Sequence, residues 1–290
     1  MTQDVSIVMP AFKAEDTIAK TVLSVIQQTH PHWELVIVAD DGMDYASILG
    51  QAGLLHPGIR FLSSDSALSS HGSGPSIPRN IGLDAAKFSY VALLDADDIM
   101  HPQKLEYAVD KLQIHPIISC ALQLLTSDFQ PLRTVGEGAD RVLSSRDYKY
   151  TNYSSDAMVV YDRQVVDPRF DPSLPCVNDV DFVLRLFAKS DHCFHFGRPL
   201  HSYVKRPISV SNGPTVEQKY TQVKNTILQR LSSGYYPFLD PETCAYMERY
   251  FVASLATEAA LSKALATDPE ALFEDCIEKI MHPQTEAAEG

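Results

Sequence analysis

Three carboxylates follow a short apolar segment in "YVALLDADDIM", residues 90–100. Because side chains of an extended chain alternate with period two, Asp95 and Asp97 lie on the same side of the chain. Two such carboxylates can share a hard cation, since Mg²⁺ and Mn²⁺ prefer oxygen ligands and magnesium is often held by one or two carboxylates together with substrate phosphates. The motif therefore predicts a site for Mg²⁺ or Mn²⁺ with a diphosphate ligand. The alternative is a solvated turn, in which Asp98 caps the following helix.

A second acidic pair, Asp40 and Asp41, follows the apolar segment "WELVIV" at 33–38. On its own, Asp41-Gly42 is typical of an ordinary turn. Next to a parallel strand that ends in Asp95 and Asp97, the same pair predicts an acidic crevice.

Hydrophobic patterning indicates the elements that must position these carboxylates. Continuous apolar runs predict strands, and apolar residues at helical spacing predict helices between them. Strands are expected at 5–9, 33–38, 90–94, 117–125 and 157–161, and helices around Ile18–Ile26, over 79–88, around Leu105–Leu112 and around Val180–Phe187. This alternation predicts an α/β fold, a mostly parallel sheet covered by helices on both faces. Ligands bind at the carboxyl ends of such strands, so the ends at Pro10–Phe12, Asp40–Asp41 and Asp95–Asp98 are expected to meet in one crevice.

The domain organisation follows from a change of pattern along the chain. We expect one domain over 1–213, with a nucleotide-binding half at 1–115 and an acceptor half at 116–213, and a C-terminal helical region at 214–290. The polar stretch 63–76 predicts a mobile loop that folds over a ligand. Its Gly72-Ser73-Gly74 is not a dinucleotide fingerprint, because it does not directly follow a strand.

Composition narrows the class of protein. The chain has 290 residues, 45% hydrophobic and 21% charged, as in ordinary globular proteins. A net charge of −13 argues against nucleic acid as a partner, since phosphate backbones require clustered Lys and Arg. Five cysteines without a CxxC pair indicate reduced thiols. We find no signal peptide and no membrane-spanning run, which favours a cytoplasmic protein that could lie at the inner face of the membrane.

Two long segments together resemble the family 2 glycosyltransferases. They are "VSIVMPAFKAEDTIAKTVLSVIQQTHPHWELVIVADDG" and "PRNIGLDAAKFSYVALLDADDIMHPQKLE", and the likeness covers roughly residues 4–110. It is traceable through "NDVDFVLRL" and weak after Pro214. The resemblance implies a GT-A fold and an inverting enzyme that uses a nucleotide-activated sugar.

Carried over motif by motif, the resemblance implies a nucleotide site at the strand ends. Its residues are Pro10, Ala11, Phe12, Glu15, Asp40, Asp41, Arg79 and Asp95. The Phe12 ring would stack on the base, and Glu15 would lie near the ribose. Asp41 would accept a hydrogen bond from a base N–H, and Asp40 lies beside it.

Around the diphosphate the resemblance implies further roles. Arg79 would lie near the base or the diphosphate. Asp95 would contact the ribose or the metal, and Asp97 would coordinate the metal. Lys205 or Arg206 could clamp the diphosphate, or could simply be surface charges.

The catalytic base implied by the resemblance is Asp179, in the first turn of a helix that begins with Asn178-Asp179. Inverting transfer needs a carboxylate that takes the proton of the acceptor hydroxyl, and a helix N-terminus favours the ionised form. An ordinary helix cap is the structural alternative. Asp181 is the second candidate for the base. Asn178 stands where the family usually has Glu.

Together these features predict a metal-dependent glycosyltransferase that moves one sugar from a nucleoside diphosphate sugar, most simply a UDP-sugar, to an acceptor hydroxyl in surface polysaccharide or glycolipid synthesis. The partners would be the donor and a carbohydrate or glycolipid acceptor, without nucleic acid. A sugar nucleotidyltransferase is one alternative, although "PAFKAED" lacks the expected glycines. A catalytically silent nucleotide-sugar-binding protein is another. Apolar stripes on the C-terminal helices are compatible with a homodimer contact and, less well, with peripheral membrane contact.

Overall fold

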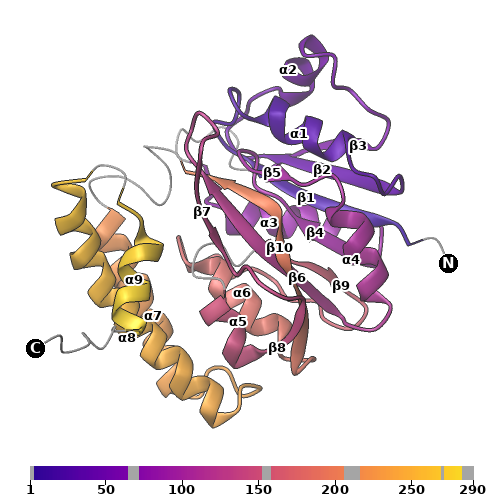
Figure 1. Ribbon diagram of the computed structural model, residues 1–290. Coiled ribbons are helices and arrows are strands. Elements are labelled where there is room, and N and C mark those ends of the chain that lie inside the picture. Colours follow the sequence, from indigo (N-terminus) through magenta and orange to yellow (C-terminus); the bar gives the residue numbers. More distant parts are fainter. Residues whose placement is uncertain (1–2, 65–71, 152–157, 206–215, 269–270, 283–290) are drawn as a thin grey trace, which may run out of the picture. The chain divides into compact units, whose positions relative to one another are not determined.

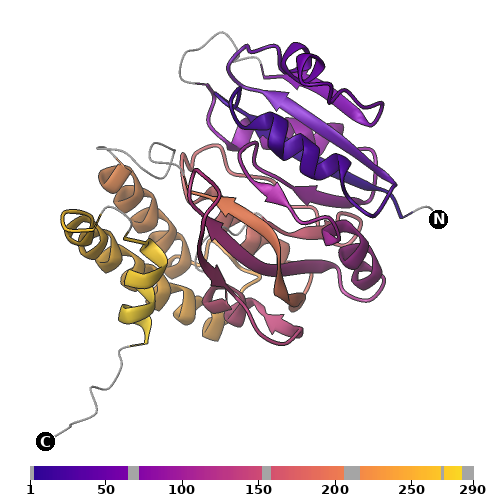
Figure 2. The ribbon, with the colours of Figure 1, turned by 45° about the horizontal axis from the view of Figure 1, so that its top comes forward.

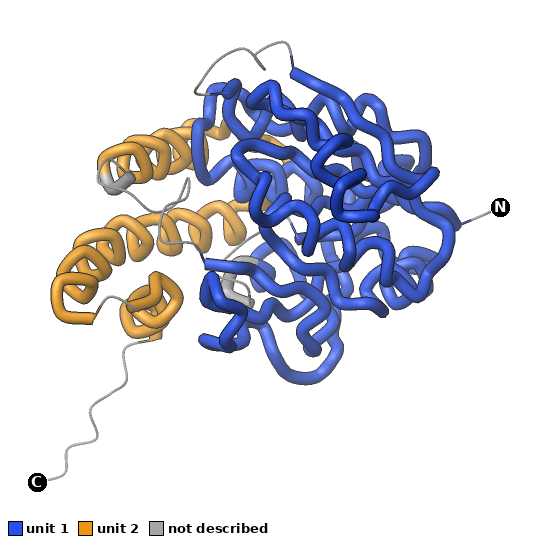
Figure 3. The backbone as a smooth tube through the Cα atoms, turned by 90° about the horizontal axis from the view of Figure 1, so that it is seen from above, with its two compact units in different colours: residues 1–209 blue, residues 210–290 orange. Residues whose placement is uncertain are grey.

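The computed structural model describes residues 3–64, 72–151, 158–205, 216–268 and 271–282. The chain divides into two compact units, residues 1–209 and 210–290 (Figure 3). Part of the predicted loop at 63–76, the first residue of the strand predicted at 157–161, and Arg206 lie outside the described residues.

The first unit is built on one mixed sheet with helices on both faces (Figure 1). Its strands are β1 (Val5–Ala11), β2 (Trp33–Ala39), β3 (Ile59–Ser63), β4 (Tyr90–Leu93), β5 (Ile99–Met100), β6 (Ile117–Leu125), β7 (Pro131–Val135), β8 (Arg141–Ser144), β9 (Val160–Asp162) and β10 (His192–Val204). Its helices are α1 (Ile18–Ile26), α2 (Tyr45–Gln51), α3 (Ser76–Ala85), α4 (Lys104–Leu112), α5 (Ser145–Thr151) and α6 (Asn178–Leu186). The strand order is β3-β2-β1-β4-β9-β6-β10-β5, with β7 beside β6 and β8 beside β10.

The parallel part of the sheet sets the positions of the acidic strand ends. β1 pairs in parallel with β2, from Val5 opposite Trp33 to Ala11 opposite Ala39. On its other side β1 pairs in parallel with β4, where Val8 lies opposite Leu93. The carboxyl ends of β1, β2 and β4 therefore lie at one edge, as the sequence predicts. Beyond β4 the sheet is mixed, since β9 is antiparallel to both β4 and β6.

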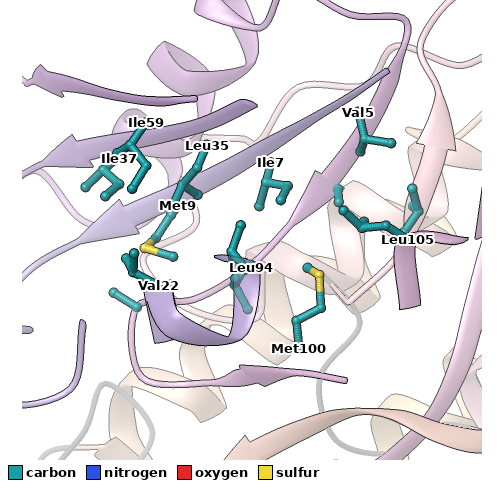
Figure 4. Close-up of a cluster of buried hydrophobic side chains, with 14 of the residues drawn as sticks. Val5, Ile7, Met9, Val22, Leu35, Ile37, Ile59, Leu94, Met100 and Leu105 are labelled. Carbon is teal, nitrogen blue, oxygen red and sulfur yellow. The ribbon is translucent and has the colours of Figure 1, made fainter. Parts of the chain in front are cut away.

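Alternation along β1 fills both faces of the sheet. Val5, Ile7 and Met9 pack in a cluster with residues of α1 and α4 (Figure 4). Val8 points to the opposite face and packs in a second cluster, which includes residues of α3 and α6. Because both faces are covered, β1 shows no alternation of polar and apolar residues. Its one polar side chain, Ser6, is buried and donates to the Glu34 carboxylate on β2 over 2.7 Å.

Strand β10 is the longest element of the sheet that patterning does not predict. Its sequence, "HCFHFGRPLHSYV", mixes His, Gly, Arg and Pro, and its register with β6 shifts between Phe196 and His201. It pairs in parallel with β6 and in antiparallel with β8 and β5 (Figure 2). Pairing with residues far away in the sequence thus overrides a weak local signal.

A buried histidine lies within this strand. The Ser119 hydroxyl is 2.8 Å from Nδ1 of His195, and Nε2 is 2.8 Å from the Gly136 carbonyl. Since the carbonyl can only accept, Nε2 donates and Nδ1 accepts from Ser119. Burial lowers the pKa of His195 to about 4, so the ring is neutral in the folded protein.

The second unit contains α7 (Val216–Ser232), α8 (Pro241–Leu265) and α9 (Phe273–Met281). Lys224 on α7 pairs with Glu258 on α8 and lies 3.3 Å from the Ser254 carbonyl. Asp240 caps α8 by accepting a hydrogen bond of 2.8 Å from the Thr243 amide. Within the described residues of either unit, every helix is too short or too polar to cross a membrane.

Packing of α3 on the sheet depends on Gly82. A Cβ atom at this position would lie 2.4 Å from Cγ1 of Val8. We expect Gly82→Ala to lower the free energy of unfolding by about 1–3 kcal/mol through overpacking. Gly50→Ala on α2 is the control, because its Cβ would meet only Leu55, at 3.4 Å, and helix propensity should stabilise it by about 0.5–1 kcal/mol. Urea unfolding measures both, and equal effects would contradict the packing argument.

The neutral His195 should make stability fall in mild acid. Its pKa is about 4 when folded, against an ordinary value of 6.5, so the unfolded chain binds the proton first as the pH falls. Between pH 6.5 and 4 we expect this group to cost up to about 3 kcal/mol of unfolding free energy. His195→Leu should be less stable at pH 7 but lack this slope. Identical pH profiles for the two proteins would contradict the assignment.

Candidate functional site

The ends of β1, β2 and β4 are joined by backbone hydrogen bonds at the predicted crevice. The Asp40 amide donates to the Ala11 carbonyl over 2.9 Å, and the Leu94 amide donates to the Val8 carbonyl over 3.1 Å. Ala11 is buried, whereas the Phe12 ring that follows is 38% exposed. The sheet thus presents Phe12 at the edge where the acidic residues lie.

The Asp41 carboxylate is held at this edge by three donors. They are the backbone N–H of Lys13, the N–H of Met43 at 3.0 Å and the Tyr45 hydroxyl at 2.8 Å. Burial raises the pKa of Tyr45, so its hydroxyl stays a donor. An ionised carboxylate has about four acceptor positions, which leaves Asp41 room for a ligand N–H. The structure also places Lys13 at a φ of 50°, in the left-handed region.

Asp40 is turned away from this group and is only 2% exposed. It accepts hydrogen bonds from the Ser64 hydroxyl, from the Ser73 hydroxyl at 2.6 Å and from the Ser73 amide at 2.7 Å. A Cβ atom on Gly72, which has a φ of +62°, would lie 2.6 Å from Asp40 and 2.9 Å from the Phe12 ring. Asp40 therefore fixes Gly72 and Ser73 against Phe12, and its predicted nucleotide contact stays a prediction.

An ion pair joins α3 to the end of β4. Nη2 of Arg79 donates to Oδ1 of Asp95 over 2.6 Å, and the guanidinium lies 5.1 Å from the centre of the Phe170 ring. Arg79 is 6% exposed. Among the described residues its Nε is buried without a hydrogen-bond partner.

The carboxylates of Asp95 and Asp97, which are the predicted metal ligands, offer the oxygen atoms that a small hard cation prefers. Asp95 and Asp97 are half-buried at the carboxyl end of β4. Across the described part of the chain, no three His, Cys, Asp or Glu side chains are grouped so that they could hold a metal. Two carboxylates are enough for Mg²⁺ or Mn²⁺ where substrate phosphates complete the coordination. The donor set is therefore compatible with a metal that arrives with a diphosphate.

Asp98 does not cap a helix, because Gln103 is the N-cap of α4. Asp98 is fully buried and contacts β10, where it accepts from the Val204 amide at 3.0 Å and lies 3.1 Å from Nε2 of His201. Burial raises the pKa of Asp98 well above its ordinary value, and Asp97 raises it further. Asp98, the third carboxylate of the motif, is thus buried in the protein interior.

Helix α6 carries Asp179 in its first turn, and one oxygen of Asp179 accepts from the Val180 amide at 3.0 Å. Val177, which precedes the helix, has a φ of 53°, a strained conformation for a β-branched residue. The Asn178 side chain is buried and donates to the Ser76 hydroxyl on α3 over 2.7 Å. The residue that differs from the family pattern therefore fastens α6 to α3.

Asp181, the second candidate for the base, is buried and forms an ion pair of 2.6 Å with Arg185 one turn later. Glu15 is exposed at the start of the segment before α1. Lys205 is described, and its backbone N–H bonds to the Leu125 carbonyl at 2.8 Å.

The structure thus brings Phe12 close to Asp41, because the amide of the next residue, Lys13, donates to Asp41, and it pairs Arg79 with Asp95. Sequence reasoning missed Tyr45, which donates to Asp41, and it missed His201, which contacts Asp98, and Lys104, which contacts His201. Each contacts residues at least four positions away, and nothing in the local pattern signals them.

Comparison with known proteins shows the family and the fold of this chain. The family model of glycosyl transferase family 2 matches residues 6–163, which is more than half of the chain. A putative teichuronic acid biosynthesis glycosyltransferase, TuaG of Bacillus subtilis, is 35% identical over 134 residues, covering 44% of this chain and 50% of TuaG. An Escherichia coli protein, the UDP-Glc:alpha-D-GlcNAc-diphosphoundecaprenol beta-1,3-glucosyltransferase WfgD, is 33% identical over 37% of this chain and 40% of its own length. The aligned segment therefore spans half or less of these curated relatives.

Among solved structures, the fold resembles that of TarS residues 1–349 from S. aureus in complex with UDP-GlcNAc. The TM-score is 0.68 at 14% sequence identity, and the match covers 97% of this chain and 80% of that one. At this identity the likeness concerns the fold.

The Asp40 contacts give a prediction about the segment before α3. Asp40→Ala removes the acceptor of three hydrogen bonds and should lower the free energy of unfolding by about 1–3 kcal/mol. Amide exchange at residues 73–76 should become faster, and Gly72→Ala should have the same effect through its clash with Phe12. Asp44→Ala is the control, because it removes only the cap of α2, worth about 1 kcal/mol. Unchanged exchange at 73–76 in Asp40→Ala would contradict the assignment.

Proposed function

Because the chain belongs to glycosyl transferase family 2 and has a GT-A-type α/β fold, we propose that it transfers a sugar from a UDP-sugar to an acceptor hydroxyl with inversion of the anomeric centre. The observation that carries the proposal is the ion pair between buried Arg79 and half-buried Asp95, close in sequence to Asp97, at the carboxyl end of a parallel strand. Ligands bind at such strand ends in open α/β sheets.

The donor would lie across the ends of β1, β2 and β4. Phe12 would stack on the base, and Asp41, oriented by three donors, would accept from a base N–H. The guanidinium of Arg79, which Asp95 orients, would lie near the base or the diphosphate. TarS bound to UDP-GlcNAc and the UDP-glucose named for WfgD support a uridine nucleotide.

A divalent cation, Mg²⁺ or Mn²⁺, would be held by the carboxylates of Asp97 and Asp95. When bound, it would offset the charge that develops on the departing diphosphate. Arg79 would also offset the charge on the departing diphosphate, because its guanidinium is fixed by Asp95 and cannot lose its proton in a protein.

Asp179 would act as the general base. A carboxylate at a helix N-terminus is stabilised in its ionised form, which is the form that accepts the proton of an acceptor hydroxyl. Asp181 suits this role poorly, because it is buried and paired with Arg185. A silent binding protein is also less favoured, since Asn178 has a structural partner in Ser76 and leaves Asp179 in place.

The biological setting would be synthesis of a surface polysaccharide or glycolipid, as the names of TuaG and WfgD suggest for those proteins. A cytoplasmic location at the inner face of the membrane, the homodimer and the peripheral membrane contact remain predictions. The domain limits at residues 213 and 214 are also predictions.

Transfer from a panel of UDP-sugars with Mn²⁺ tests the proposal. Asp179→Asn should lower kcat by about 10²–10⁴-fold, the usual contribution of a general base, and leave UDP binding intact. Asp97→Asn should instead weaken binding of UDP in the presence of Mn²⁺. Asp84→Asn is a matched control, because Asp84 forms only a surface ion pair with Arg169. A fully active Asp179→Asn protein would show that the base is another residue, and absence of any nucleotide binding would overturn the proposal.

A further inference from the structure

A buried row of three polar side chains contacts the turn at residues 95–98, called here the DADD turn. Nζ of Lys104 is 3.0 Å from Nδ1 of His201, and Nε2 of the same ring is 3.1 Å from Oδ2 of Asp98. The three residues are between 0 and 2% exposed. Three titratable groups removed from water in this way are costly unless each is paired, so the arrangement needs a physical reason.

The direction of the hydrogen bonds follows from the groups. An ammonium group can only donate, so Lys104 donates to Nδ1, and Nε2 of His201 donates to the Asp98 carboxylate. Lys104 also donates to the Met158 carbonyl over 3.1 Å. The second carboxylate oxygen of Asp98 accepts from the Val204 amide over 3.0 Å. Each acceptor thus has its donor, which is what makes such burial tolerable.

These contacts join parts of the first unit that are far apart in sequence. Asp98 closes the turn that carries the candidate metal ligands, since its amide donates to the Asp95 carbonyl over 3.2 Å. Lys104 begins α4, and His201 lies near the end of β10, opposite Met100 of β5. The turn therefore cannot move without disturbing β10.

We propose that Lys104 and His201 are positioning residues for the sugar transfer: they hold Asp98, and through it Asp95 and Asp97, in the geometry that would bind the metal and the diphosphate. The inference rests on the proposed function. It adds two residues that contact neither the donor nor the metal. One of them, His201, lies on β10, outside the predicted nucleotide-binding half at 1–115.

The test compares variants at His201 and Lys104, using UDP with Mn²⁺ as the probe and calorimetry as the readout. His201→Leu and Lys104→Met should weaken binding of UDP with Mn²⁺ by about 10- to 100-fold, the usual effect of losing a residue that orients a metal ligand. His201→Gln should restore most of the affinity, because a side-chain amide also offers one acceptor and one donor. In transfer assays the KM for the donor should rise more than kcat falls.

His195→Leu is the matched control. His195 is a buried histidine of the same strand, with hydrogen bonds to Ser119 and Gly136 and none to the DADD turn. It should lose stability as His201→Leu does, while UDP affinity at a temperature well below unfolding stays unchanged. Equal UDP affinities of His195→Leu and His201→Leu would show that Lys104 and His201 have a purely structural role, and would overturn the inference.

Hydrogen exchange of the unaltered protein covers the case in which the variants do not fold. Adding UDP with Mn²⁺ should protect amides at 98–101 and at 200–204 together. Protection of the first segment without the second would overturn the inference and leave the proposed function standing. A protein that binds no UDP with Mn²⁺ would overturn both.

Discussion

Parallel pairing of β1 with β2 and β4 is the constraint on which the rest of the structure depends. Strands covered on both faces are mostly apolar, and the carboxylates Asp40, Asp41 and Asp95 follow the points where the strands end. Parallel strands end at the same edge, and the register of β1 with its neighbours brings Ala11, Ala39 and Leu93 to it. Phe12, Asp41 and Asp95 are together for this reason.

The carboxylates at this edge are held by hydrogen bonds and an ion pair, and several of their partners, among them Tyr45, Ser64 and Arg79, are buried. Asp41 receives three hydrogen bonds, Asp40 fixes Ser73, and Asp95 is paired with Arg79. A buried polar group left without its partner costs about 1–3 kcal/mol, so these contacts leave each carboxylate few alternative orientations. Such preorganisation suits the proposed binding of a diphosphate, because the charged groups need not rearrange when it binds.

Helix α3 connects the donor side of this edge to the candidate base. It carries Arg79, which contacts Asp95, and Ser76, which receives the hydrogen bond of Asn178 beside Asp179. Asn80 on the same helix pairs with both backbone groups of Phe170, at 2.8 and 2.9 Å. The close approach of Gly82 to β1 keeps this helix against the sheet. Helix α3 thus contacts both Asp95, a proposed ligand of the donor or metal, and the start of α6, the helix that carries the proposed base.

The sequence by itself determined the elements whose signals are local. Apolar runs and helical spacing identify β1, β2, β4, β6 and α6, and the D-x-D spacing identifies Asp95 and Asp97 as a carboxylate pair. Tertiary structure alone decided that Asp40 faces Ser73, that Asp98 is internal rather than a helix cap, and that β10 joins the sheet. It also decided that Lys104 and His201 meet Asp98, although 97 positions separate Lys104 from His201. The reason is physical: patterning reports the burial and conformation of neighbouring residues, whereas the partner of a buried polar group is set by which distant strand or helix packs beside it.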